Sequence, residues 1–463
     1  MPSPLVRPVG FFVKWEHPET EQDWSWPIRT YSSPPHSPST RWFRAWRETV
    51  LGIILICVGI PAIHAAPAHS HALYEGRTLE QWRDAIKSLD PRSNEAAAAV
   101  PGLLAIAKDP HAPWFSRRQA ALTLGRIGPQ SASAVPEITA LIQRPPTDED
   151  PTTSIWAVQA LALWGPVAAP ATPVLIELVS HPATDSHLRL VAVEALGRIG
   201  TADIRSLPAI VRQLQWHPPH RDGSTTRSGQ ELDLVSACIE CLDLYGGEAI
   251  AAVPVLLRFS EDREERIRRA VAVTLGRIGL RAEQAAPRLA ELILADRSED
   301  VRDVAAISLG QVGGTELLSR LLSHPQATTR ERAATGLGWA PADETSRNAL
   351  QIGRNDVEPR VRMAAIEATQ KRFPDTVLTA PLAAREMAAE DRHVRIRAVR
   401  FLTLLGRQAH PAEQALQSLT NHPHPHVRQS AQRLLDGLSS DPPTNPALQN
   451  SPGKAVPDRP ERQ

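Results

Sequence analysis

Cysteine and histidine are the residues with which this chain could do redox or metal chemistry. Cys238 and Cys241 form a C-x-x-C motif, a spacing found in dithiol redox centres and in metal sites. His422, His424 and His426 alternate with prolines and could present three imidazoles to a transition metal. His-Pro pairs also recur along the chain, at His181, His217, His324 and His422.

The C-x-x-C pair has a simpler interpretation as part of a hydrophobic core. In the repeat register described below, the two cysteines occupy the slots that Ala192 and Ala195 hold in the preceding repeat. Buried cysteines that stand in for alanine are therefore favoured. Leu242 follows in place of histidine, so the haem-attachment pattern is absent. The third cysteine, Cys57, lies in an apolar run that we expect to be removed, which excludes a disulfide scaffold.

The histidines also favour a structural role. In an extended segment the side chains of His422, His424 and His426 point to alternating sides, and no carboxylate or cysteine lies nearby, so they are only weak metal candidates. The His-Pro pairs fall in turns after helices, where imidazoles can cap the last carbonyls. We expect no cofactor. The chain has no H-E-x-x-H, no G-x-S-x-G, no phosphate-binding glycine loop and no H-E pair of the di-iron type, so no residue set nominates a reaction.

These residues are carried by a pattern that is clearest in residues 267–296. Ile267, Val271, Leu275 and Ile278 form an apolar stripe on a helix of about three turns, helix B, which Gly279 ends. A second helix, helix A, follows, with a proline near its start where a missing N–H costs least. The sequence therefore predicts pairs of amphipathic helices.

The spacing of the pairs is regular. Six times, a proline follows the residue that ends helix B by eight positions, at 128–136, 165–173, 200–208, 246–254, 279–287 and 373–381. An arginine recurs eleven residues before the end of eight B helices, while Ser154 and Val235 fill two further slots. This predicts ten B helices. Because the arginine lies beside acidic turn residues, we expect salt bridges between repeats, with candidate partners Asp262, Asp300, Asp356 and Asp391.

Two motifs resemble HEAT repeats of the phycobilisome-lyase-like subclass. They are V-R-x-x-A-A-x-x-L-G at residues 301–310, and L-G-R-I-G beginning at Leu124, Leu196 and Leu275. The resemblance covers roughly residues 77–438. The chain also resembles exported bacterial HEAT-repeat proteins. It implies an all-α fold, an α-solenoid of antiparallel helix pairs in a HEAT/armadillo-like superhelix. It implies little about function, because the family is mostly a shape that carries different sites.

The composition agrees with one long repeat array. The chain has 463 residues, 42% of them hydrophobic, and its 51 Lys and Arg balance its 51 Asp and Glu. Without a strong positive field, nucleic acid is not an expected partner.

The N-terminus predicts export. Residues 1–48 hold five of the eleven tryptophans without periodicity and are expected to be an unstructured leader. Residues 49–68 read as a signal peptide or membrane anchor, because the apolar run 50–63 follows three arginines and precedes small residues. The run is short for a membrane span, which needs about 20 residues. We expect cleavage and delivery to the periplasm or cell envelope, with anchorage by the uncleaved segment as the alternative.

The remaining chain divides into three predicted parts. Residues 74–110 are expected to form capping helices, with an opening helix from Tyr74 to Leu89, residues 111–438 the solenoid, and residues 439–463 a disordered tail. The repeat around residues 216–230 carries an insertion, and surface insertions in solenoids often carry recognition. Its Trp216, His220, Arg221 and Asp222, and Trp339 in place of the L-G-R-I-G arginine, are the candidate partner contacts. Core packing is the alternative for Trp339.

We therefore expect a non-catalytic scaffold that binds another protein or peptide across a face formed by the B helices. One alternative, implied only by the resemblance, is an enzyme or enzyme subunit of the bilin-lyase type. A nucleic-acid binder is the other.

Overall fold

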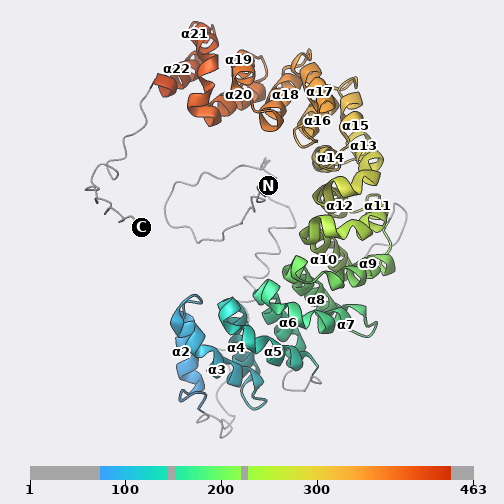
Figure 1. The fold of residues 1–463 in the computed structure, drawn as a ribbon, viewed down its shortest axis with the longest axis vertical. Helices are drawn as coiled ribbons and strands as arrows, with labels where there is room; N and C mark the ends of the chain where they lie inside the picture. Colours follow the sequence, from blue (N-terminus) through green and yellow to red (C-terminus); the bar gives the residue numbers. More distant parts are fainter. Residues whose placement is uncertain (1–72, 144–151, 221–227, 440–463) are drawn as a thin grey trace, which may run out of the picture. The chain divides into compact units, whose positions relative to one another are not determined.

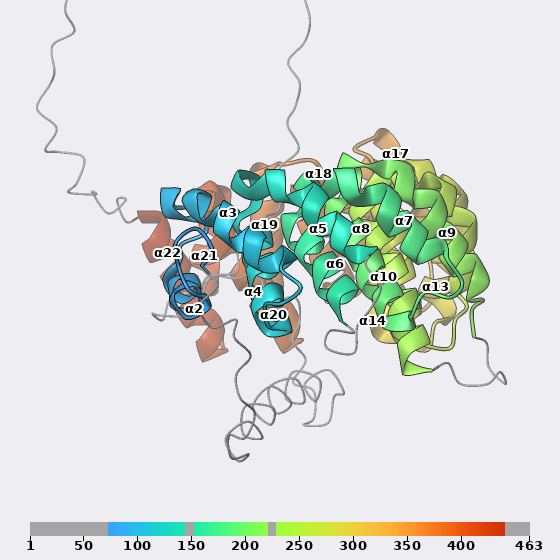
Figure 2. The same ribbon diagram turned by 90° about the horizontal axis from the view of Figure 1, so that it is seen from below.

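The computed structural model describes residues 73–143, 152–220 and 228–439, which belong to one compact unit. Within these ranges all regular secondary structure is helical and no strand forms (Figures 1 and 2). The predicted all-α solenoid is therefore confirmed. The predictions for the leader, the export segment and the tail beyond residue 439 lie outside the described residues, as do those for Arg221 and Asp222.

The helices form two layers, in which each B helix contacts the B helices before and after it (Figure 1). The B layer comprises α4 (Trp114–Ile127), α6 (Thr153–Trp164), α8 (Ser186–Ile199), α10 (Gly229–Tyr245), α12 (Glu265–Ile278), α14 (Glu299–Gln311), α16 (Ala327–Leu337), α18 (Pro359–Arg372), α20 (Arg392–Leu405) and α22 (Pro425–Ser439). The A layer comprises α5 (Val135–Ile142), α7 (Thr172–Ser180), α9 (Leu207–Trp216), α11 (Val253–Phe259), α13 (Ala286–Ala295), α15 (Thr315–Leu321), α17 (Glu344–Arg354), α19 (Thr376–Glu386) and α21 (Glu413–Leu419).

The eight-residue spacing has a defined geometry. In five repeats a glycine with positive φ ends helix B and starts a seven-residue 3-10 helix that leads into helix A; these are η2 (Gly128–Ala134), η3 (Gly165–Ala171), η6 (Gly246–Ala252), η7 (Gly279–Ala285) and η8 (Gly406–Ala412). Glycine suits this position because it has no Cβ to clash in the left-handed region. The spacing from Phe373 to Pro381 is different. Phe373 has φ −134°, and Pro381 lies inside α19, so the inclusion of this pair was wrong.

Small residues let successive B helices approach closely. The third residue before the helix-ending position is glycine in several repeats, and a Cβ added to Gly310 would collide with the carbonyl oxygen of Gly336 in the next B helix. A Cβ on Gly336 would in turn collide with the carbonyl oxygen of Ala306. These glycines therefore set how close α14 and α16 can lie.

The first helices differ from the prediction in where they begin. The opening helix α2 spans Leu79–Ser88, and residues 74–77 form a turn, because Thr78 caps the helix in a capping box with Gln81. The indole nitrogen of Trp82 donates to the carbonyl oxygen of Tyr74 at 2.8 Å. The Trp82 ring also fills the space beside Gly102 of α3 (Asn94–Lys108). This ring therefore fixes α2 on the stack.

The hydrophobic core is divided within α18. One cluster of buried side chains runs from Tyr74 to Ala368, and a second runs from Met363 to Leu438. Contacts between α20 and α22 are much sparser than those between earlier B helices. The last repeats are therefore packed less closely than the rest.

Among the described residues, one stretch, Thr153–Ser180, has the length and apolar composition of a membrane span. Gly165 breaks it with φ +56°, and it consists of α6, η3 and α7. Its side chains include Trp156, Leu161 and Leu175, which are fully buried in the core.

Candidate functional site

The recurrent arginine joins the turn before its helix to the next repeat. In α12, Nη1 of Arg268 donates to the carbonyl oxygens of Asp262 and Arg263, each at 2.9 Å. Nε and Nη2 of the same side chain donate to the two carboxylate oxygens of Asp296, at 2.7 and 2.9 Å. Asp296 follows α13, so this arginine links two successive turns.

The same arrangement recurs, with partners that differ from those predicted. Arg330 binds Asp356 through two hydrogen bonds, as its position suggested. Arg362 binds Glu386 in the same way and donates to the carbonyl oxygen of Asp356. The predicted salt bridge was wrong for Asp300, whereas Asp391 does form a salt bridge between repeats, although not with the recurrent arginine. Asp262 contributes its carbonyl oxygen to Arg268, no arginine bridge to Asp300 is seen among the described residues, and Asp391 pairs with Arg360 instead.

These bonds keep the carboxylates charged. Burial raises the pKa of Asp296, but hydrogen bonds from Arg268 and from the Ser298 backbone outweigh burial and hold the pKa below its ordinary value. The pKa of Asp356 is lowered by the same balance, with burial opposed by Arg330 and the Glu358 backbone. Both acids are therefore structural anions.

The histidines of three His-Pro turns accept hydrogen bonds, so the predicted capping of carbonyls was wrong. Nδ1 of His181, His324 and His422 accepts from the backbone N–H two residues later, at 3.1 to 3.2 Å. Asp109 and Asp356 make the equivalent turn with a carboxylate oxygen. A neutral imidazole has one acceptor nitrogen, which can replace the acid here.

The insertion is shorter than predicted and is tied down at its base. Trp216 is the last residue of α9, and α10 already begins at Gly229. The backbone N–H of His220 donates to the Asp262 carboxylate at 2.9 Å, and the Arg263 N–H donates to the His220 carbonyl oxygen. Asp262 lies in the turn after α11, as Asp296 lies after α13. The recurrent arginine that would reach it belongs to α10, but Val235 occupies that position. The insertion base therefore takes the place of that arginine on this carboxylate.

Both candidate tryptophans lie on the surface. Trp216 is 47% exposed and Trp339 is 42% exposed, so the core-packing alternative for Trp339 was wrong. Nζ of Lys371 lies 2.6 Å from the centre of the Trp339 ring. Desolvation, with the nearby Arg372 charge, lowers the pKa of this lysine to about 8.

Trp339 belongs to a row at the carboxyl ends of the B helices. We name this set the B-end row: the residue two positions before each helix-ending position. All but Gln311 are exposed, and the members in the first nine B helices are Arg126, Leu163, Arg198, Leu244, Arg277, Gln311, Trp339, Lys371 and Leu404. Apolar and basic side chains are mixed along the row, and no member is acidic.

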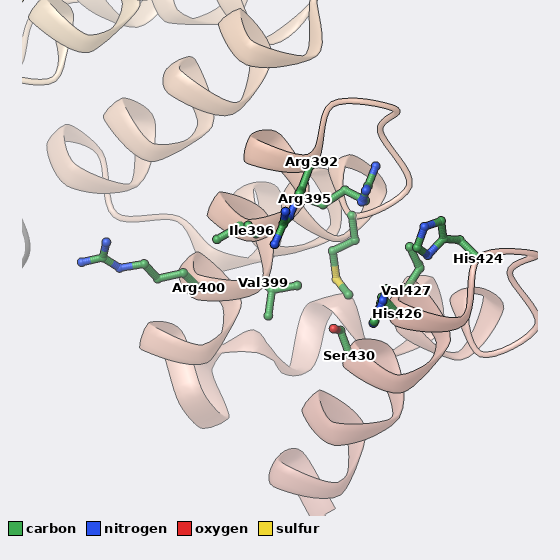
Figure 3. A pocket seen from close by; sticks show the side chains of 10 residues that line it. Arg392, Arg395, Ile396, Val399, Arg400, His424, His426, Val427 and Ser430 are labelled. Carbon is green, nitrogen blue, oxygen red and sulfur yellow. The ribbon is translucent and has the colours of Figure 1, made fainter. Parts of the chain in front are cut away.

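Sequence reasoning missed a cavity of about 670 Å³ between α20 and α22. Arg392 and Arg395 of α20 approach it from one side, and His424 and His426 from the other, with Val399 and Ser430 below them (Figure 3). Arg400 extends away from its centre (Figure 3). The sequence held no local signal for it, because the position of Val399 holds alanine, valine or isoleucine in the earlier B helices.

The histidine cluster does not form a metal site. In the described part of the chain, no three His, Cys, Asp or Glu side chains converge in a way that could hold a metal ion. Nδ1 of His422 is used by the His424 N–H at 3.1 Å. The rings of His424 and His426 lie 5.4 Å apart, centre to centre. The weak metal candidate is therefore not supported.

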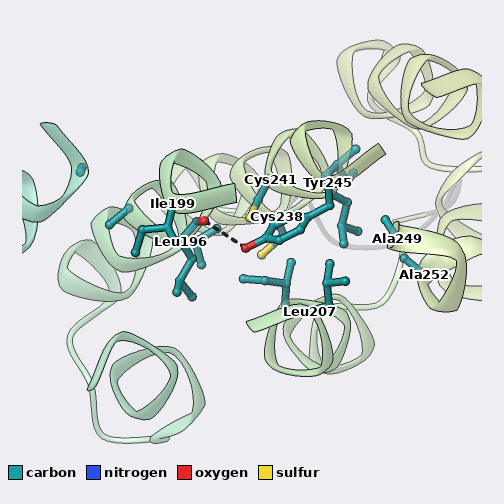
Figure 4. Packing of buried hydrophobic residues seen from close by; sticks show 14 of the residues in the cluster. Leu196, Ile199, Leu207, Cys238, Cys241, Tyr245, Ala249 and Ala252 are labelled. Carbon is teal, nitrogen blue, oxygen red and sulfur yellow. Dashed lines mark hydrogen bonds between the residues drawn. The ribbon is translucent and has the colours of Figure 1, made fainter. Parts of the chain in front are cut away.

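Cys238 and Cys241 lie in the core as free thiols (Figure 4). Burial raises the pKa of Cys238 to about 12 and that of Cys241 well above its ordinary value, so both stay protonated. Nearby, the Tyr245 hydroxyl donates to the carbonyl oxygen of Leu196 at 3.1 Å (Figure 4). The packing interpretation of the C-x-x-C motif is therefore confirmed.

The comparisons with known proteins agree with the repeat architecture. The family described as HEAT repeats matches residues 138–221 and 231–310. No curated protein sequence matches the chain.

Several solved structures are similar to the chain at low identity. An engineered protein shares 16% identity over 78% of this chain and 95% of its own, with a TM-score of 0.39. The complex of CpcE and CpcF of phycocyanin lyase from Nostoc shares 19% over 63% and 98%, with a TM-score of 0.33. A structure from work on the phosphorylation-controlled interaction of cadherin and beta-catenin shares 12% over 78% and 94%, with a TM-score of 0.36.

The family match falls on the helix pairs from α5 to α14. The B helices of these pairs each end near a glycine, and three of the five, α8, α12 and α14, carry the recurrent arginine near their start. Residues 138–221 and 231–310 therefore match HEAT repeats, within a helical array that continues on both sides of them.

Proposed function

We propose that the protein is a non-catalytic scaffold that binds an extended segment of another protein. The observation that carries this proposal is the B-end row. Its exposed apolar members are 40% exposed at Leu163, 59% at Leu244, 42% at Trp339 and 61% at Leu404. Basic members stand between them. Since packed helices lie about 8 to 10 Å apart, such a row offers regularly spaced anchors to one polypeptide.

The insertion is a second, separate contact candidate. Helix α9 runs antiparallel to the B helices beside it, so its last residue, Trp216, lies at the opposite edge of the stack from the B-end row. His217 and His220 both face Glu231, at 3.5 and 3.9 Å, and leave the Trp216 ring exposed. The two edges can therefore be tested independently.

A crosslinking pull-down from the envelope fraction tests the proposal. The baits are the full chain, a Leu163→Glu, Leu244→Glu double variant, a variant lacking residues 221–227, and Val377→Glu. The deletion leaves the hydrogen-bonded base at His220 in place. Val377 is the matched control, because it is 74% exposed on α19 in the A layer.

We expect one partner to be recovered by the full chain and by Val377→Glu, and to be lost with the double variant. A partner lost only with the deletion would move the contact to the insertion. Equal recovery by all four baits, or recovery of no partner, would refute the proposal that the row binds.

We further propose that the protein acts outside the cytoplasm. The support is the order of charges, apolar run and small residues around residues 41–68. Mass spectrometry of the envelope protein should find a mature N-terminus after Ala65 or Ala68. A reporter enzyme that is active only after export should be active when fused behind residue 73. An inactive reporter would refute export, and an active reporter with an intact N-terminus would indicate anchorage by residues 50–63.

A further inference from the structure

The surface of α20 that should contact the next B helix is uncovered. Seven residues before the helix-ending position, the eight earlier B helices each hold a buried apolar residue, namely Ala121, Val158, Val193, Ile239, Ala272, Ala306, Ala334 and Ile366. At the same position Val399 is partly exposed, and Thr403 one turn later is exposed. Burial of such a surface is favourable, so this face is available to a ligand.

The mouth of the resulting groove is positive. Among the described residues, Arg392 makes no hydrogen bond or ion pair, and Arg395 uses only Nη1, on the carbonyl oxygens of Ala389 and Glu390. None of the side chains that line the cavity is acidic. Desolvation lowers the pKa of His424, and the neighbouring basic groups Arg395, His426, His422 and Arg428 lower it further. Helices α20 and α22 both begin here, and helix N-termini favour negative charge.

The groove becomes apolar farther along the two helices. A second cavity of about 340 Å³ shares Val399 and Ser430 with the first. Its lining includes Leu402, Leu416 and Leu434, and Arg433 is the one charged residue in it. A ligand that follows the helices therefore meets positive charge at one end and an aliphatic surface at the other.

We propose that this groove binds an acidic-apolar peptide segment, with carboxylates at Arg392 and Arg395 and aliphatic side chains beside Val399 and Leu434. The inference rests on the proposed scaffold function and assigns the chemistry of one partner segment. A peptide fits better than a fatty acid, because the groove is open to solvent along its length, with Ile396 53% exposed. An open groove can accommodate a chain that carries several carboxylates.

Fluorescence anisotropy with the full chain tests this inference. The probe is a labelled peptide with a run of glutamates followed by leucines, and the same peptide with glutamines is its control. The protein variants are Arg392→Glu, which reverses an unpaired charge, and Ser430→Trp, which fills the groove without changing charge. Arg118→Glu is the matched control. Arg118 is an exposed arginine on α4, so its substitution changes the net charge by the same amount at a site away from the groove.

We expect the glutamate peptide to bind, and Arg392→Glu and Ser430→Trp each to weaken binding at least about tenfold. Arg118→Glu should change Kd by less than about twofold, and the glutamine peptide should bind weakly. The inference would be overturned if the glutamate peptide does not bind, or if Arg392→Glu and Arg118→Glu weaken its binding equally. Binding of palmitate at the groove without peptide binding would also overturn it.

The two proposals can fail separately. If Arg392→Glu and Ser430→Trp recover the same partner as the full chain in the pull-down, while the peptide does not bind, the scaffold stands and the groove assignment fails. If the peptide binds the groove but no partner depends on the B-end row, the row assignment fails instead.

Discussion

The guanidinium of Arg268 and the carboxylate of Asp296 face each other across two repeats through hydrogen bonds of 2.7 and 2.9 Å. Only 6% of the arginine side chain and 3% of the aspartate side chain are exposed. A buried, bidentate pair differs in energy from the many ion pairs on the surface of this chain, because removal of one partner leaves a charge without water.

Replacement of this arginine should be strongly destabilising. Arg268→Ala leaves the Asp296 carboxylate buried without its main partner, and such losses cost about 3 to 5 kcal/mol. Arg266→Ala is the control, because its pair with Asp233 is 49% and 39% exposed and should contribute at most about 1 kcal/mol. Urea unfolding followed by circular dichroism measures both. Equal losses would show that burial of the pair has no energetic consequence.

The buried carboxylates should make stability fall in acid. The folded pKa values of Asp296 and Asp356 lie below the ordinary 3.8. Well above pH 3.8 both acids are charged in either state and their contribution to stability is complete. As the pH falls towards the folded pKa values, the unfolded chain takes up protons first and this stability is lost.

The melting temperature, measured between about pH 5 and pH 2, should therefore fall less steeply for Asp296→Asn than for the unchanged chain. The variant is expected to be less stable at neutral pH. Parallel curves for the two proteins would mean that Asp296 does not contribute to acid sensitivity.

The close approach of α14 and α16 predicts a second large effect. Gly310→Ala places a methyl group against the Gly336 carbonyl oxygen, and overpacking of this kind costs about 1 to 3 kcal/mol. Gly229→Ala is the control, since its Cβ would meet nothing within 4 Å. Thermal unfolding should separate the two variants. A stable Gly310→Ala protein would show that the two helices can move apart freely.

Lys371 should be unusually reactive. Its pKa of about 8 means that near pH 8 the Lys371 amine is neutral in about half of the molecules, whereas an ordinary lysine with pKa 10.5 is almost fully charged. Acetylation at pH 8, followed by mass spectrometry, should modify Lys371 faster than the exposed Lys87. Trp339→Ala admits water to the amine and should slow the reaction. An unchanged rate would exclude the Trp339 ring as the cause.

The sequence predicted the helix pairs because burial repeats with the helical period at Ile267, Val271 and Leu275. It also identified the arginine slot, but not all of its partners. Asp296 and Glu386 lie 28 and 24 residues after their arginines, and the irregular turns between these residues hide the pairing. The left-handed glycines were visible as helix stops, while the 3-10 helices after them were not.

The candidate contact residues were harder to predict. Trp339 was ambiguous because its slot holds arginine in the three L-G-R-I-G repeats and leucine in others, and exposure depends on how the neighbouring helix ends. His220 was singled out for its side chain, whereas its backbone makes the bonds to Asp262 and Arg263. The groove depends on the separation of α20 and α22, which is a property of packing and has no local motif.

The arginine pairs also define where this chain can be cut and rejoined. Residues 330–361 contain both Arg330 and its acid Asp356, and Arg362 donates to backbone carbonyl oxygens that any residue supplies. Excision of residues 330–361 would place Arg362 directly after Thr329, where it inherits the carbonyl groups that Arg330 now binds. The exchangeable unit of this protein therefore runs from one arginine to the next, and not from one loop to the next.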